Sequence, residues 1–210
     1  MSILDELSEQ LQEGRAKAVK QIVEQALAEG FPPKEILDGL LVGMGIIGAK
    51  FKKNEVFVPE VLVAARAMNM GVAILKPFLS VAEVKLNGKV CLGTVQGDLH
   101  DIGKNLVKIM MESKGLEVVD LGVDVPAEMF IKTAVEQKCQ IIACSALLSM
   151  TMGELKAVVD ATKRAGIRDK VKIMVGGAPV TQEFCDQIRA DCYAPDATSA
   201  AEAAVELCGM

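Results

Sequence analysis

The only histidine of the 210-residue chain, His100, lies in the segment GDLHDIGKNLV, residues 97–107. A strand-like run, VCLGTVQ, precedes this segment, and a helix-like run, KNLVKIMMESKG, follows its first half. An imidazole that binds a metal uses one ring nitrogen and usually donates the N–H of the other to a carboxylate. Asp98, two residues before the histidine, is placed to supply that carboxylate. We therefore predict that His100 is a metal ligand, with a surface or packing histidine as the alternative.

A metal at this position would need most of its ligands from elsewhere. The chain has no second histidine, and its cysteines form no CxxC pair. A zinc site of the usual ligand set is therefore improbable, and a metal that arrives inside a tetrapyrrole-like macrocycle fits better. The six cysteines are most simply buried thiols of a cytosolic protein; they are Cys91, Cys139, Cys144, Cys185, Cys192 and Cys208.

The same segment does not bind a nucleotide phosphate. A P-loop needs four residues between its glycines and a hydroxyl residue after the lysine. Here Gly97 and Gly103 enclose five residues, and Asn105 follows Lys104. Asp98 and Asp101 would also repel phosphate, and the GxGxxG dinucleotide fingerprint is absent.

Charge and hydropathy exclude two further classes of partner. A net charge of −5 argues against a nucleic-acid binder, which normally presents a basic face. No apolar stretch approaches the roughly 18–20 residues of a membrane span. The N-terminus, MSILDELSEQLQEG, is acidic and unlike a signal peptide. We expect a cytoplasmic protein that binds neither nucleic acid nor membrane.

The first 80 residues have helical periodicity throughout. Leu4, Leu7 and Leu11 recur at helical spacing, and further apolar stripes follow in three more segments. Gly30 and the proline pair after it end one segment and begin the next. Four helices joined by short turns predict an antiparallel bundle over residues 1–80.

From Lys89 onward, short β-branched runs alternate with segments of helical length. The expected strands are KVCLGTV, GLEVVDL, QIIACSAL, KVKIMVGG and a weaker ADCYA. Such alternation predicts a five-stranded parallel sheet with helices on both faces, a Rossmann-like domain over residues 89–210. A flavodoxin-like strand order, 2-1-3-4-5, fits this pattern. Residues 81–88 are the expected linker.

In that strand order, ligands bind outside the carboxyl ends of the strands where the chain reverses direction. His100 follows the first strand, Ser145 ends the third, and Gly176 and Gly177 follow the fourth. All of them should therefore lie on one rim of the sheet, which makes the loop around His100 a ligand site.

Three motifs carry a resemblance to a known family. Asp98-Leu99-His100-Asp101-Ile102-Gly103 resembles the DxHxxG motif of the cobalamin-binding domains in methionine synthase and the corrinoid methyltransferases. The family pattern continues with SxL and then GG. Here 41 residues separate Gly103 from Ser145-Ala146-Leu147, and a further 28 precede Gly176-Gly177. Residues 59–77, PEVLVAARAMNMGVAILKP, resemble the last helix of the helical cap that precedes this domain in the methyltransferase branch.

The resemblance implies a cobalamin or related cobamide whose own base is displaced, so that the histidine becomes the lower ligand of cobalt. His100 takes that role, Asp98 is its hydrogen-bond partner, and Thr151 corresponds to a hydroxyl residue that completes the group. Ser145 and Leu147 would contact the buried base of the displaced tail, and Gly176 and Gly177 would let the tail pass close to the backbone. The implied cofactor-binding set is Asp98, His100, Asp101, Ile102, Gly103, Ser145, Leu147, Ser149, Thr151, Gly176 and Gly177.

The implied function is that of a corrinoid methyl carrier in anaerobic one-carbon metabolism, a subunit of a methyltransferase system rather than a complete enzyme. Its implied partners are a substrate-specific methyltransferase, a second methyltransferase that uses tetrahydrofolate or a thiol, and a reductive activation protein. Two alternatives share the DxHxxG domain: the cobalamin-binding subunit of an adenosylcobalamin mutase and a cobalamin-dependent sensor.

Overall fold

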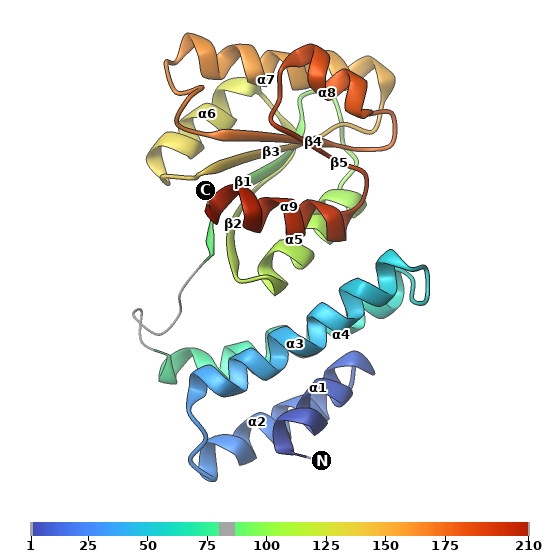
Figure 1. Cartoon of the computed structure of the whole chain (residues 1–210), viewed down its shortest axis with the longest axis vertical. Helices are drawn as coiled ribbons and strands as arrows, with labels where there is room; N and C mark the ends of the chain where they lie inside the picture. Colours follow the sequence, from blue (N-terminus) through green and yellow to red (C-terminus); the bar gives the residue numbers. More distant parts are fainter. Residues whose placement is uncertain (1, 80–86, 210) are drawn as a thin grey trace. The chain divides into compact units, whose positions relative to one another are not determined.

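The computed structural model describes residues 2–79 and 87–209. The chain divides into two compact units, Met1–Lys85 and Leu86–Met210, called here the helical unit and the α/β unit (Figure 1). The linker expected at residues 81–88 falls outside the described residues except for its last two positions.

The helical unit is a bundle of four helices. They are α1 (Ile3–Gln12), α2 (Ala16–Ala28), α3 (Pro33–Lys52) and α4 (Val58–Leu75), and a 3-10 turn, η1 (Lys76–Phe78), follows. A capping box between Ser2 and Asp5 begins α1, and a proline lies in the first turn of both α3 and α4. Their apolar stripes meet in a core that includes Leu7, Leu11, Val19, Val23, Ile36, Leu40, Met44 and Val61.

One helix of this bundle is more apolar than its sequence was expected to be. Within the described ranges, only the helical stretch Val58–Phe78 has the length and composition to cross a membrane. The expectation that no apolar stretch approaches that length is therefore wrong. Val61, Ala64 and Met68 are buried in the bundle core, while Glu60 and Arg66 are exposed. Packing against α2 and α3 accounts for the buried apolar residues of α4, while Leu62 and Val63 stay exposed.

The α/β unit has the predicted architecture. Its strands are β1 (Gly88–Val95), β2 (Leu116–Val125), β3 (Ile141–Ser145), β4 (Lys172–Gly176) and β5 (Cys192–Ala194). They pair in parallel in the order β2-β1-β3-β4-β5, which confirms the flavodoxin-like order. The connecting helices are α5 (Ile102–Ser113), α6 (Ala127–Glu136), α7 (Met152–Arg164), α8 (Gln182–Ile188) and α9 (Ala197–Gly209), with a 3-10 turn, η2 (Ser149–Thr151), before α7.

Helices cover both faces of the sheet. Helices α5 and α9 pack on one face, and α6, α7 and α8 pack on the other (Figure 1). Because both faces are covered, the central strands are apolar on both sides, as in Val90, Cys91, Ile141 and Ile142. All six cysteines are free thiols; four are buried, as predicted, and Cys192 and Cys208 are half-buried.

The edge strand β2 is longer than the sequence predicted. The apolar run was expected to end at Leu121, but the strand continues to Val125. Its pairing with β1 shifts register twice, between Leu92 and Gly93 and again between Gly93 and Val95. Gly122 and Asp124, which have positive φ angles of 83° and 55°, lie in the shifted stretch. Two β-bulges therefore lengthen β2 just where it approaches the loop around His100.

Candidate functional site

The loop between β1 and α5, residues 96–101, carries the histidine. Gly97 turns the chain with a φ of 79°, and the Asp98 N–H donates to the carbonyl oxygen of Val95 at 3.2 Å. Asp101 precedes the first helical residue of α5, Ile102. A tight turn at the carboxyl end of a central strand thus directs Asp98 inward, where it is fully buried, and leaves the His100 side chain half exposed.

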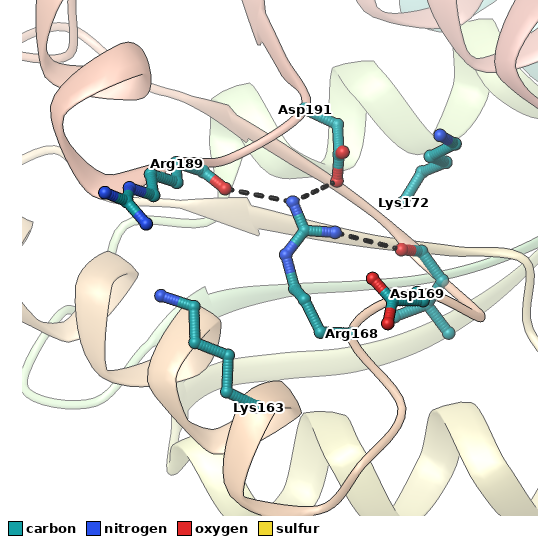
Figure 2. A pocket seen from close by; sticks show the side chains of 7 residues that line it. Lys163, Arg168, Asp169, Lys172, Arg189 and Asp191 are labelled. Atoms are coloured by element: carbon teal, nitrogen blue, oxygen red, sulfur yellow. Dashed lines mark hydrogen bonds and ion pairs between the residues drawn. The ribbon is translucent and has the colours of Figure 1, made fainter.

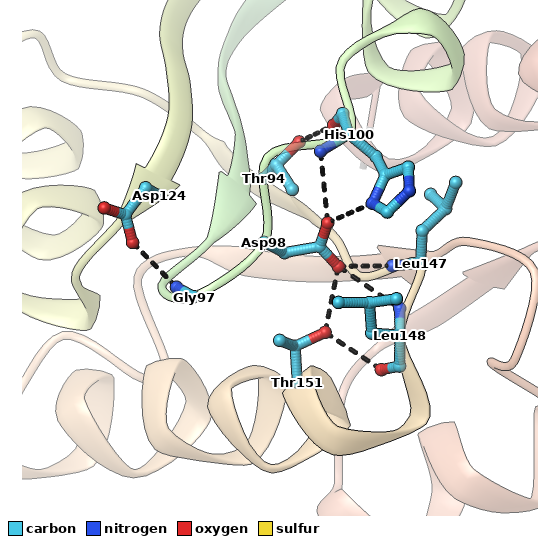
Figure 3. A network of polar contacts seen from close by, with 8 residues as sticks. All are labelled: Thr94, Gly97, Asp98, His100, Asp124, Leu147, Leu148 and Thr151. Atoms are coloured by element: carbon cyan, nitrogen blue, oxygen red, sulfur yellow. Dashed lines mark hydrogen bonds and ion pairs between the residues drawn. The ribbon is translucent and has the colours of Figure 1, made fainter.

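Asp98 holds His100 at two points, one on the imidazole and one on the backbone. The imidazole Nδ1 lies 2.7 Å from Asp98 Oδ1, and the backbone N–H of His100 donates to the same oxygen at 3.1 Å (Figure 3). A carboxylate oxygen can only accept, so Nδ1 carries the proton. In the neutral ring with this tautomer, Nε2 is the nitrogen with a lone pair that can bind a metal.

The second oxygen of Asp98 joins this loop to the segment that follows β3. Asp98 Oδ2 accepts the N–H of Leu147 at 2.7 Å, the N–H of Leu148 at 3.2 Å and the hydroxyl of Thr151 at 2.9 Å. Burial by itself would raise the pKa of Asp98, but the hydrogen bonds from His100, Leu147 and Thr151 hold it well below its usual range. Asp98 is thus a stable carboxylate that accepts from five donors.

Thr94 supports the same loop, although sequence reasoning did not single it out. Its side chain is fully buried in β1, and its hydroxyl donates to the carbonyl oxygen of His100 at 2.8 Å. The signal in the sequence was a hydroxyl residue within an otherwise apolar strand. Thr94 is also the register neighbour of Ser145, which in turn pairs with Gly176.

The residues predicted on β3 and β4 therefore lie on the expected rim. Ser145 and Gly176 end neighbouring strands, and the Ala146 N–H donates to the Gly176 carbonyl oxygen at 3.1 Å. Gly177 has a structural requirement of its own. Its φ is 121°, and a Cβ there would lie 2.0 Å from the carbonyl oxygen of Ala146. The close approach of two loops demands glycine at this position, and its role toward a cofactor stays a prediction.

The other predicted residues lie around the network but do not join it. The Asp101 carboxylate accepts from the Asn105 side chain at 3.3 Å, within the first turn of α5. Ile102 and Gly103 are exposed at the start of that helix, and a Cβ on Gly103 would meet no heavy atom within 4 Å. Ser149 is exposed at the start of η2. These four positions are exposed at the start of α5 and of η2.

The surroundings of His100 suit a large metal-bearing ring better than a bare ion. Over the described stretches of the chain, no three His, Cys, Asp or Glu side chains form a group that could hold a metal ion. Large apolar side chains instead lie open in the two segments that Asp98 joins: Leu99 and Ile102, in sequence around His100, are 73% and 71% exposed, and Met150, next to Thr151, is 85% exposed. A single imidazole nitrogen with an apolar surround fits a macrocycle that supplies the other metal ligands itself.

A second polar cluster lies at the opposite ends of the strands. There Arg168 donates to Asp191 at 2.9 Å and to the carbonyl oxygen of Arg189 at 2.9 Å, beside a pocket of about 390 Å³ (Figure 2). Asp191 also accepts the N–H of Ile173 at 2.7 Å. These bonds tie the segment before β4 to the segment before β5, so we assign this cluster a structural role.

Comparison with known families identifies the class of protein that this fold and site define. Residues 88–205, almost the whole α/β unit, match a family model described as a B12 binding domain. Residues 3–76 match a second model with the same description. The chain belongs to the B12-binding family and is a corrinoid-binding protein.

Similar proteins are named corrinoid proteins, and the matches cover most of both chains. The chain is 44% identical to the dimethylamine corrinoid protein of Methanosarcina barkeri, over 98% of this chain and 97% of the relative. It is 46% identical to trimethylamine corrinoid protein 1 of Methanosarcina acetivorans, over 85% and 84% of the two chains. The methanol:cobalamin methyltransferase complex MtaBC from Methanosarcina barkeri contains a chain that matches with a TM-score of 0.90 at 31% identity, over 99% of this chain and 80% of that one.

Proposed function

We propose that this protein is a methyl carrier that accepts a methyl group from one methyltransferase on a bound corrinoid and delivers it to a second. The relatives named dimethylamine and trimethylamine corrinoid proteins, and the methyltransferase complex, support this role. The observation that carries this proposal is the contact between His100 and Asp98. The His100 Nδ1 is held by the buried carboxylate of Asp98, and its Nε2 is left to bind cobalt.

The residues of the rim support a corrinoid bound with its own base displaced. His100 would be the lower ligand of cobalt, beside the exposed apolar side chains of Leu99, Ile102 and Met150. Ser145 and Leu147 would contact the base of the displaced tail, and the tail would pass Gly176, where no side chain stands in its way. Asp101, Gly103 and Ser149, which are exposed around the loop, would complete the contacts.

When bound, the corrinoid supplies a nucleophilic Co(I) centre that takes up a methyl group and gives it up again. The chain contributes control of the lower ligand. Asp98 keeps the proton on Nδ1 and fixes the plane of the ring, while Thr151, Leu147 and Leu148 hold Asp98 in place. Groups that orient a metal-bound histidine in this way also raise its basicity, so they set how strongly His100 binds the metal.

Three kinds of partner follow from this role. A substrate-specific methyltransferase would supply the methyl group, and a second methyltransferase would pass it to tetrahydrofolate or a thiol. Because a Co(I) centre is easily oxidised, a reductive activation protein would return it to the active state.

Reconstitution tests the proposed function directly. The full chain is loaded with hydroxocobalamin, reduced with titanium(III) citrate and treated with carbon-13 methyl iodide as the simplest donor. We expect one methyl group taken up per bound corrinoid, and its loss to a thiol only when an acceptor methyltransferase is added. Failure to retain corrinoid, or retention without methylation after reduction, would contradict the proposal. Isomerase activity with adenosylcobalamin and a mutase large subunit would favour the mutase alternative.

A further inference from the structure

Asp124, at the end of the edge strand β2, makes two hydrogen bonds with the histidine loop, residues 96–101. Its carboxylate Oδ1 accepts the N–H of Gly97 at 2.7 Å. Its own backbone N–H donates to the carbonyl oxygen of Asp98 at 3.0 Å. The two bonds engage Gly97 and Asp98, consecutive residues of the loop that carries His100, and Figure 3 shows the bond to Gly97.

The backbone around Asp124 is shaped to make this contact. Between the residues that pair with Leu92 and Val95, β2 contains two more residues than β1, because Leu92 pairs with Asp120 and Val95 with Val125. The extra length is taken up in left-handed backbone at Gly122 and Asp124. Bulges of this kind redirect a side chain beside a functional site and cost some regular pairing. A non-glycine residue with a φ of 55° is also strained, which is tolerated where the conformation is needed.

The contact is not explained by burial. The Asp124 side chain is exposed, so it contributes little to the core of the α/β unit. Gly97 itself has a φ of 79°, and the carboxylate holds the N–H of this turn in one direction. This turn sets the direction of the Asp98 side chain, and Asp98 holds the His100 ring.

We propose that Asp124 is a positioning residue for the lower ligand: through Gly97 and Asp98 it holds the His100 imidazole in the orientation that binds cobalt. The inference rests on the proposed role of His100 as ligand. It adds a residue outside the DxHxxG, SxL and GG motifs, on a strand that contributes none of them.

Two substitutions separate the effect of the Asp124 side-chain acceptor from the effect of its left-handed backbone. Asp124→Asn keeps a side-chain oxygen for the Gly97 N–H, and asparagine tolerates left-handed backbone. Asp124→Gly relieves the strained φ and keeps the backbone bond to Asp98, but it removes the acceptor. Lys138→Gly is the matched control, because Lys138 also has a φ of 55° and lies exposed at the end of α6.

Two readouts are measured on the full chain. In the protein without corrinoid, amide hydrogen exchange reports whether the Gly97 N–H is held. In protein labelled with nitrogen-15 histidine and loaded with cob(II)alamin, EPR reports the fraction of cobalt with an axial nitrogen from the protein, and dilution reports corrinoid dissociation. We expect Asp124→Gly to expose the Gly97 amide and to speed dissociation about tenfold, the lower range for groups that orient a metal-bound histidine. Asp124→Asn and Lys138→Gly should match the wild type in both.

Each outcome decides the inference. The inference would be overturned if Asp124→Gly showed the same Gly97 amide exchange and the same corrinoid dissociation as the wild type. It would also be overturned if Asp124→Asn and Asp124→Gly speeded corrinoid dissociation equally. If the wild-type protein gives no axial nitrogen signal from His100, the proposed function fails. An exposed Gly97 amide without any change in axial ligation would overturn the positioning role alone, so the two failures are distinguishable.

Discussion

Thr151 and Asp98, 53 positions apart in the chain, meet where Thr151 Oγ1 lies 2.9 Å from Asp98 Oδ2. The same hydroxyl lies 2.9 Å from the carbonyl oxygen of Leu148. A hydroxyl has one proton, so it donates to one acceptor at a time. The charged carboxylate is the stronger acceptor, and Thr151 therefore donates to Asp98 and links η2 to the histidine loop.

Thr151→Val should weaken this link without changing the size of the side chain. It removes one hydrogen bond to a buried charge, which typically contributes about 1.5–3 kcal/mol. We expect a lower free energy of unfolding by that amount and faster corrinoid dissociation, measured by urea unfolding and by dilution of the loaded protein. Thr151→Ser retains the hydroxyl and is the control. A Thr151→Val variant that unfolds and releases corrinoid like the wild type would contradict the role of this hydroxyl.

Lys104→Met should destabilise the helix that begins after the loop. Lys104 is 2% exposed, and its Nζ lies 2.6 Å from Asp120 Oδ1 and 2.7 Å from Asn105 Oδ1. Loss of one member of a buried ion pair costs about 3–5 kcal/mol; we expect about 3 here because Asp120 is a quarter exposed. Lys108→Met is the control, because Lys108 is 33% exposed and 3.4 Å from Asp120. It should cost about 1 kcal/mol or less.

The same ion pair predicts a dependence of stability on pH. Burial acts to raise the pKa of Asp120, but the hydrogen bonds from Lys104 and from the Gly122 N–H outweigh it and lower the pKa. A lowered carboxyl pKa contributes stability that is complete above the unfolded value, about 3.9, and is lost as the pH falls through the folded value. The difference in unfolding free energy between wild type and Lys104→Met should therefore shrink below about pH 4. A difference that stayed constant from pH 7 to pH 3 would argue against this coupling.

Gly177→Ala should destabilise the α/β unit through the backbone. A Cβ at this position would collide with the Ala146 carbonyl oxygen and would face a φ of 121°. Strain and overpacking together should cost about 2–4 kcal/mol. Gly153→Ala is the control in the same unit, because no heavy atom lies within 4 Å of the added Cβ and the residue is helical. Calorimetry of the two variants should show a lower Tm for Gly177→Ala only.

The sequence predicts the architecture because the hydrophobic periodicity and the lengths of the segments distinguish strands from helices. The strand order, the helices on both faces and the rim shared by His100, Ser145 and Gly176 all follow from alternating β and α segments. The apolar length of α4 was underestimated, since the isolated charges of Glu60 and Arg66 interrupt the pattern without interrupting the helix.

The contacts that fix the histidine follow less directly from the sequence. The pairing of Asp98 with His100 is local, so spacing predicts it, and Thr151 was found through the family pattern. Asp124 was missed because the second strand was expected to end at Leu121. Its approach to Gly97 depends on register shifts between β1 and β2, which the pairing of the folded strands determines.

The most direct test of the account uses the fact that the chain has a single histidine. The protein is grown with nitrogen-15 histidine, loaded with unlabelled cob(II)alamin and measured by EPR. Coupling of Co(II) to the His100 ring nitrogen should split each resolved cobalt line into a doublet, because the nitrogen-15 nucleus has a spin of one-half. A triplet unchanged from the unlabelled protein would mean that the cofactor's own base remains the ligand, and it would contradict the central claim that His100 binds cobalt.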